Sequence, residues 1–107
     1  METKYALAAL TAVAQESRLA VFRLLVRTGP GGMAATRIAE QLGIAPSSLS
    51  FHLKHLAQAG LVIQKHEGRF MIYSANFETM NALLGFLTEN CCGGAPCAAS
   101  GGCAVPA

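Results

Sequence analysis

The sequence has 107 residues and no aspartate, and its six acidic residues are all glutamate. Ser48, His52 and Cys91 are residue types that act as nucleophile or base in enzymes, but such groups need an orienting partner. Ser48 and His52 are predicted to share one exposed helix, and no carboxylate lies near them in the sequence. We therefore expect that the protein is not an enzyme.

Cysteine is absent from the first 90 residues, and all four cysteines lie between Cys91 and Cys103. A secreted protein that depends on disulfides would distribute its cysteines through the fold. The sequence also lacks an apolar stretch long enough to span a membrane. We therefore expect a cytoplasmic protein that is neither a disulfide scaffold nor a membrane protein.

Charged residues are scarce, at 13% of the chain, whereas apolar residues make up 52%. This charge content is low for the surface of a monomer, so a second copy is expected to cover some of the apolar surface. A chain of this length has room for one domain of ordinary size. The net charge is only +2, and every lysine and arginine lies within residues 4–69. We predict one homodimeric domain with its positive charge in that range.

The clearest pattern lies between Gly43 and Val62, where Leu49, Leu53 and Leu56 recur at helical spacing. This spacing predicts a helix with one buried apolar stripe. The other positions carry hydroxyls, imidazoles, a ring and a lysine, which are groups that bind base edges and phosphates. The candidate DNA contacts on this face are Ser47, Ser48, Ser50, Phe51, His52, Lys54 and His55.

A shorter predicted helix, Ala34 to Leu42, precedes this one across the tight link Gly43–Ala45. Two helices joined in this way are typical of a helix-turn-helix. Pro46 suits the first position of the second helix, because its missing N–H has no partner there in any helix. Arg37, in the first helix, is a further candidate contact to DNA.

Two strand-like segments follow, Leu61 to Lys65 and Phe70 to Ala75, with a turn at residues 66–69. A β-hairpin directly after a recognition helix is typical of a wing. Arg69 in the turn is predicted to enter the minor groove or to contact a phosphate. The alternative is that Arg69 is only a solvated turn residue. The fold class is therefore mainly α with a β-hairpin wing, a winged helix-turn-helix.

Three further helices are predicted around this unit. Thr3 to Ala14 is apolar on nearly every side, Ser17 caps a helix that runs to Arg27, and Phe77 to Glu89 has a wide apolar surface. The last helix is expected to pack against the first helix and its symmetry mate, which places the dimer interface there.

The segments S-x-S-F-H-L-K-H-L-x-x-A-G-L-V (Ser48 to Val62) and S-R-L-A-V-F-R-L-L (Ser17 to Leu25), in this order of elements, resemble the ArsR/SmtB family of metal-responsive bacterial repressors. The resemblance covers roughly Leu7 to Leu87. It implies a winged-helix homodimer that binds operator DNA without metal and leaves it when an inducer binds. It also implies DNA recognition by residues at positions 47, 48, 50, 51, 52 and 55 and a wing contact by Arg69.

The chain departs from this family at the usual ligand positions. The founding arsenic sensors carry Cys-Val-Cys-Asp in the first helix of the helix-turn-helix, whereas this chain has Ala39-Glu40-Gln41-Leu42. Zinc sensors of the family carry acidic and histidine pairs on the last helix, but residues 77–89 contain neither aspartate nor histidine. Any ligands for an inducer are therefore expected elsewhere.

The cysteines of residues 91–107, a segment expected to be a flexible tail beyond a domain of residues 1–90, offer such ligands. Adjacent cysteines suit a structural zinc site poorly, since zinc prefers C-x2-C spacing. They suit a soft, three-coordinate ion such as arsenite. Cys91, Cys92 and Cys97 are the predicted ligands of As(III), as the resemblance to some arsenic-responsive members also implies, and Cys103 is a possible third or fourth ligand.

Other functions remain open for this tail. Clustered exposed thiols oxidise easily, so the tail can instead be a redox switch, or it can have no function. A third hypothesis is an arsenic or metal carrier that does not bind DNA. The residues do not decide between arsenite, antimonite, trivalent methylarsenic and cadmium, nor between ligands from one subunit and ligands from two.

Overall fold

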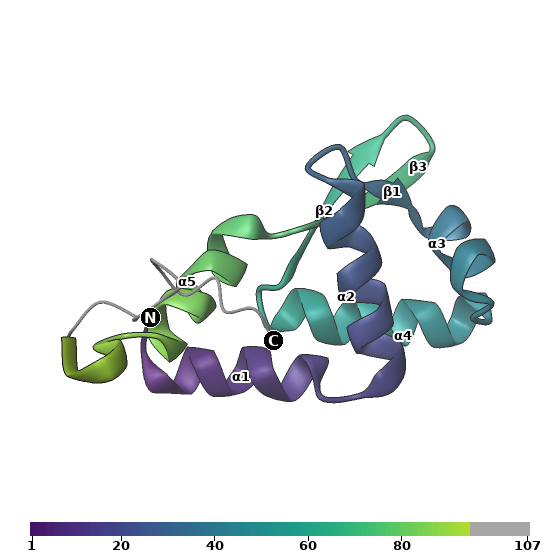
Figure 1. Cartoon of the computed structure of the whole chain (residues 1–107). Coiled ribbons are helices and arrows are strands. Elements are labelled where there is room, and N and C mark those ends of the chain that lie inside the picture. The colour runs from purple at the N-terminus through teal and green to yellow at the C-terminus, as the bar shows by residue number, and fades with distance from the viewer. Residues whose placement is uncertain (95–107) are drawn as a thin grey trace.

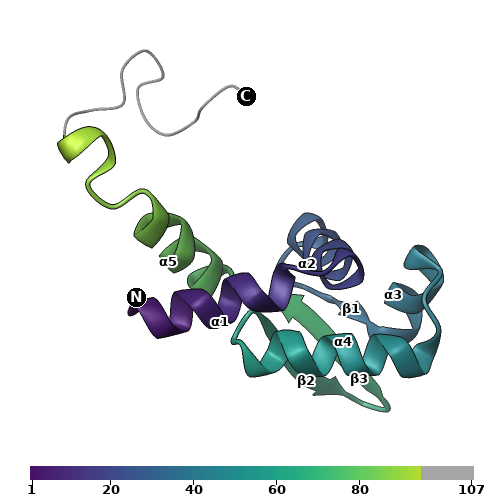
Figure 2. The same cartoon turned by 90° about the horizontal axis from the view of Figure 1, so that it is seen from below.

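The computed structural model describes residues 1–94, and residues 95–107 lie outside the described part of the chain. The elements in chain order are α1 (Thr3–Val13), α2 (Glu16–Thr28), β1 (Met33–Ala34), α3 (Ala35–Leu42), α4 (Pro46–Gln58), β2 (Val62–Glu67), β3 (Phe70–Ala75), α5 (Phe77–Leu87) and a 3-10 turn, η1 (Cys91–Gly94). In the two views, α1 and α5 lie at one end of the molecule, and α3 and the tip of the hairpin lie at the other (Figure 1, Figure 2).

The core forms where α4 packs against α2 and α3. Leu49, Leu53 and Leu56 of α4 are each at most 2% exposed, and they share one apolar cluster with Leu25 of α2 and Ile38 of α3. Full burial of an aliphatic side chain of this size contributes about 1.5–3 kcal/mol. The predicted apolar stripe is therefore confirmed, and its burial fixes which face of α4 points outward.

The wing is part of a three-stranded antiparallel sheet with the strand order β1-β3-β2. The hairpin of β2 and β3 was predicted, but β1 was not. In β1, Met33 pairs with Tyr73 and Ala34 pairs with Ile72. The predicted four-residue turn was also too long, because β2 continues to Glu67, which pairs with Phe70. Only residues 68 and 69 connect the two strands.

Two predicted helix boundaries were wrong for local reasons. The first turn of α2 is capped by Gln15, whose side-chain oxygen accepts a hydrogen bond from the Arg18 backbone N–H at 2.9 Å, so the helix begins before the predicted cap, Ser17. The helix α5 ends at Leu87 and not at Glu89. The side chain of Asn76 caps its start by accepting from the Thr79 N–H at 3.2 Å.

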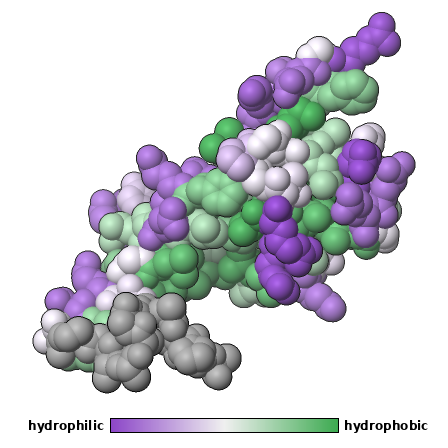
Figure 3. All heavy atoms as spheres, turned by 45° about the horizontal axis from the view of Figure 1, so that its top comes forward, coloured by the Kyte–Doolittle hydropathy of each residue, from purple (hydrophilic) through white to green (hydrophobic). Residues whose placement is uncertain are grey.

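The helices α1 and α5 leave apolar side chains exposed. No residue of α5 is buried, and Leu84 and Leu87 are more than half exposed. Tyr5 and Leu7 of α1 are also more than half exposed. In the space-filling view, apolar residues cover much of the centre of this face (Figure 3). Within residues 1–94, no helix has the length and apolar character needed to cross a membrane.

Gly32 generates a prediction about the sheet. Its φ is +75°, and an added Cβ would lie 2.6 Å from the carbonyl oxygen of Tyr73 and 2.8 Å from Cγ2 of Ile72. Gly32→Ala is therefore expected to disturb the β1–β3 pairing and to lower the free energy of unfolding by about 1–3 kcal/mol. Urea denaturation followed by circular dichroism measures this change.

Gly31→Ala is the matched control, because nothing lies within 4 Å of a Cβ at Gly31. We expect its stability to be unchanged or slightly raised. Equal destabilisation by the two substitutions would contradict the tight β1–β3 contact.

Candidate nucleic-acid interface

The outward face of α4 presents polar side chains around one aromatic ring. Ser47, Ser48, Ser50 and Lys54 are exposed, and Phe51 is 58% exposed. Hydroxyls and a lysine can bind base edges and phosphates, and a phenylalanine ring can contact the methyl group of thymine. The chemistry of this exposed face therefore suits the major groove.

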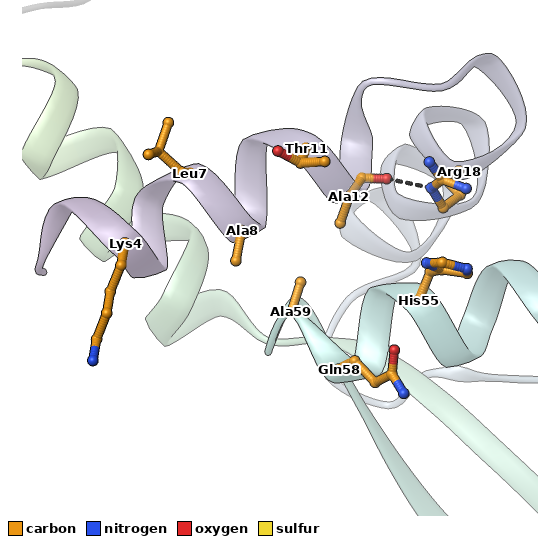
Figure 4. A pocket seen from close by; sticks show the side chains of 9 residues that line it. All are labelled: Lys4, Leu7, Ala8, Thr11, Ala12, Arg18, His55, Gln58 and Ala59. Carbon is orange, nitrogen blue, oxygen red and sulfur yellow. Dashed lines mark hydrogen bonds between the residues drawn. The ribbon is translucent and has the colours of Figure 1, made fainter.

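His52 and His55 were predicted on the exposed face of α4, but both are half-buried. The ring of Phe51 packs edge-on against His55, with 4.5 Å between centroids, and lies 6.1 Å from the ring of His52. In the close view, the Arg18 side chain of α2 lies above His55 (Figure 4). The two histidines therefore form the border between the exposed face of α4 and the rest of the domain.

The environment of His52 disfavours its charged form. Burial lowers the pKa of His52 below its usual value of 6.5, and the positive charges of Arg18 and His55 lower it further. The Nδ1 atom of His52 is buried and makes no hydrogen bond in the described structure. Burial and the neighbouring positive charges thus both favour the neutral form of the His52 imidazole.

The two predicted arginine contacts lie in α3 and in the turn of the wing. Arg37 of α3 is exposed, and its Nε lies 4.0 Å from Oε1 of Glu40, a surface ion pair of small energetic value. Arg69 is exposed in the tight turn of the wing, next to Gly68, whose φ is +61°. Both guanidinium groups are therefore accessible to a nucleic acid. Whether these residues and those of α4 contact DNA stays a prediction.

The first two predicted arsenic ligands lie beyond α5. Cys91 and Cys92 begin the turn η1, and their Sγ atoms are 3.7 Å apart. Cys92 has a φ of 56°, which is uncommon for a residue other than glycine. The other two, Cys97 and Cys103, lie outside the described residues. Within residues 1–94, no three histidine, cysteine or acidic side chains come together as a metal site.

Arg18 was not predicted as a site residue, although it lies beside both histidines of α4. Its Nε donates a hydrogen bond to the carbonyl oxygen of Ala12 at 2.6 Å. No sequence motif announces this contact between α2 and the end of α1. The only sequence signal was a basic residue in the first turn of α2.

Comparison with known proteins agrees with this geometry. A family described as a helix-turn-helix domain matches residues 13–64. The transcriptional repressor SdpR of Bacillus subtilis (strain 168) is 35% identical over 63 residues, which cover 55% of this chain and 70% of the repressor. The chain belongs to the ArsR family of transcriptional regulators.

Solved structures of ArsR-type regulators have the same fold. One is a possible transcriptional regulator for arsenical resistance, with 26% identity, a TM-score of 0.64, and coverage of 74% of this chain and 79% of that one. Another is the homodimeric winged helix-turn-helix domain of Mb0332 from Mycobacterium bovis, with 24% identity, a TM-score of 0.66, and coverage of 81% of each chain. This ArsR-family member is therefore a DNA-binding transcriptional repressor with a winged helix-turn-helix fold, and it is not an enzyme.

The half-buried His52 generates a prediction for stability against pH. Because its folded pKa is lowered, the unfolded chain binds more protons once the pH falls below about 6.5. The stabilisation that comes from the lowered pKa of His52 is fully present above that pH. It is lost as the pH falls through the lower pKa of the folded state. The melting temperature is therefore expected to fall between pH 7.5 and pH 5, and His52→Gln should reduce this dependence. The same pH dependence of the melting temperature in His52→Gln and in the wild type would contradict this role of His52.

Phe51 generates a prediction for DNA recognition. Phe51→Ala is expected to weaken binding to the selected operator by about tenfold or more, because it removes an apolar contact to a base edge. Binding to a scrambled duplex, which depends on phosphate contacts, should hardly change. Titration of both labelled duplexes measures the difference, and an equal loss on both would contradict a base contact by Phe51.

Proposed function

We propose that the protein is a homodimeric cytoplasmic repressor that binds its operator through α4 and the wing and releases it when trivalent arsenic binds Cys91, Cys92 and Cys97. The observation that carries this proposal is the separation of 3.7 Å between the Sγ atoms of Cys91 and Cys92. Zinc–thiolate bonds of about 2.3 Å at tetrahedral angles place two sulfurs about 3.8 Å apart, which gives the scale of the separation between two thiolates on one ion. The two sulfurs thus already have the spacing of ligands on one ion.

The third ligand comes from the chain that follows. Cys97 follows Cys92 by five residues, and five residues can span at most about 17 Å, so a short loop is enough to bring the third thiol to the pair. The glycines at positions 93 and 94 make such a loop easier to close. Three thiols replace the three hydroxyls of arsenous acid and release three waters. Soft thiolates without nitrogen or oxygen partners favour such an ion over magnesium or calcium. The likeness to a possible regulator for arsenical resistance supports the same choice.

The inducer acts through the apolar end of the molecule. Cys91 follows α5, and α5 lies beside α1 at the end opposite to α3 and the wing (Figure 1). A second copy that covers the exposed faces of α1 and α5 makes the dimer, as the homodimeric M. bovis structure supports. Ligand binding at the end of α5 then changes the spacing of the two α4 helices, which must match major grooves about 34 Å apart. A hundredfold preference for the DNA-incompetent state shifts the equilibrium by about 2.7 kcal/mol.

A redox-responsive repressor is the alternative that the same sulfurs favour. The two neighbouring sulfurs are placed for oxidation as well as for ion binding. Antimonite, trivalent methylarsenic or cadmium would use the same thiolates, with Cys103 as an additional ligand for the larger ions. The hypothesis of a carrier without DNA binding is not retained, because the family consists of DNA-binding regulators.

A repressor–reporter assay tests the role of the cysteines. With Cys91 and Cys92 both replaced by Ser, the reporter should stay repressed, because α4 and the wing are untouched, and arsenite should no longer induce it. Direct measurement of bound arsenic on the purified proteins should show about one ion per binding site in the wild type and none in the variant.

Thr88→Ser is the matched control near this site, and it should keep arsenite induction. Cys97→Ser and Cys103→Ser, tested separately, identify the third ligand. Loss of repression by the double serine variant would mean that the cysteines support the fold or the DNA contact, and it would refute their role as the sensor.

A further inference from the structure

A pocket of about 470 Å³ lies between α1, the start of α2 and the second half of α4. Its polar lining residues are Arg18, His55 and Gln58 at one end, Lys4 at the other and Thr11 between them (Figure 4). The rest of the lining is apolar and consists of Leu7 and three alanines. Among residues 1–94, no carboxylate lines this pocket. A pocket with three nitrogen-rich side chains and a lysine, and without acidic groups, suits an oxyanion.

Arg18 is held in place at the wall of this pocket. The hydrogen bond from its Nε to the Ala12 carbonyl oxygen fixes the guanidinium above His55. In the described part of the chain, Arg18 forms no ion pair with a carboxylate. Its two terminal NH₂ groups therefore remain available to a ligand from outside, in the forked geometry that suits a phosphate.

The pocket continues the DNA-facing stripe of α4. Ser48, Phe51, His55 and Gln58 follow one another at i, i+3, i+7 and i+10, so they lie along one side of the helix. Ser48 and Phe51 are exposed on the first half of α4, and His55 and Gln58 line the pocket. A duplex whose bases contact the first half of α4 therefore brings a backbone strand to the pocket.

We propose that Arg18, His55 and Gln58 bind one phosphate of the operator backbone, at a site where α2 adds an arginine to the second half of α4. This proposal rests on the DNA binding stated above. A phosphate contact carries no sequence information, but it fixes the register of the protein on the duplex. Because Arg18 also holds the end of α1, the site links the DNA backbone to the helix that carries the apolar, dimer-side surface.

Duplexes with single neutral methylphosphonates test the site. The operator is first selected from random sequence with the full reduced chain, and each phosphate is then neutralised in turn. One position per half-site should weaken wild-type binding by about tenfold. That position should have little effect with Arg18→Gln or with His55→Ala. Arg18→Gln should also reduce the slope of log K against log salt by about one, because it removes a cation from the phosphate.

Arg23→Gln is the matched control, since Arg23 is an exposed arginine of the same helix that does not line this pocket. It should keep the wild-type response to every methylphosphonate. Arg18→Gln also removes the contact of Arg18 to Ala12, and thermal denaturation shows whether this variant still folds. If it does not fold, His55→Ala and Gln58→Ala test the site without this contact being changed.

Two results would overturn the proposal. One is a methylphosphonate profile that is the same in the wild type and in all pocket variants. The other is saturable binding of inorganic phosphate to the free protein, seen as shifts of the NMR signals of the His55 ring, while no methylphosphonate position depends on the pocket residues. The ligand of the pocket would then be a free anion and not a DNA phosphate. A wild-type chain that selects no sequence would refute the proposed function itself, which distinguishes that failure from a failure of the phosphate site.

Discussion

Burial of the apolar stripe of α4 is the interaction on which the rest of the structure depends. Leu49, Leu53 and Leu56 are almost completely buried against α2 and α3. Since a helix has a fixed angular spacing, this burial also determines that Ser48 and Phe51 point outward. The direction of the outward face of α4, with its predicted DNA contacts, is thus set by core packing.

The two ends of the molecule have opposite surface chemistry. Around α4 and the wing, hydroxyls and cations are exposed, whereas α1 and α5 expose apolar side chains and α5 has no buried residue at all. An isolated chain with this surface leaves much apolar area in water, which a second copy can cover. Cys91 and Cys92 directly follow α5, so the inducer site proposed there lies at the apolar end and away from α4 (Figure 1).

Much of the fold was predictable because its signals are local. Helical periodicity, Pro46 and the hairpin pattern identified α4 and the wing, and the resemblance of the Ser48–Val62 segment identified the family. The two-residue strand β1 was missed because it is defined by pairing with β3, which no local pattern encodes. The half-burial of His52 had a signal that was overlooked: it is three residues after Leu49 and four before Leu56, so it borders the buried stripe.

The candidate site was predictable only in part. The residue types on α4 indicated DNA, but the approach of Arg18 to His52 and His55 depends on how α2 crosses α4, which is a tertiary property. Likewise, adjacent cysteines in a sequence do not determine the distance between their sulfurs. That distance depends on the backbone of the turn, where Cys92 adopts a left-handed conformation.

The central proposal is that one chain binds an operator and releases it when a thiophilic ion binds the chain. Fluorescence anisotropy of a labelled duplex from the protein's own promoter, titrated with reduced protein and then with arsenite, zinc and an oxidant in separate experiments, tests it most directly. The account predicts tight binding that arsenite reverses and zinc hardly affects. Tight binding that is indifferent to arsenite but lost on oxidation would contradict arsenic sensing, and absence of specific binding would contradict the account as a whole.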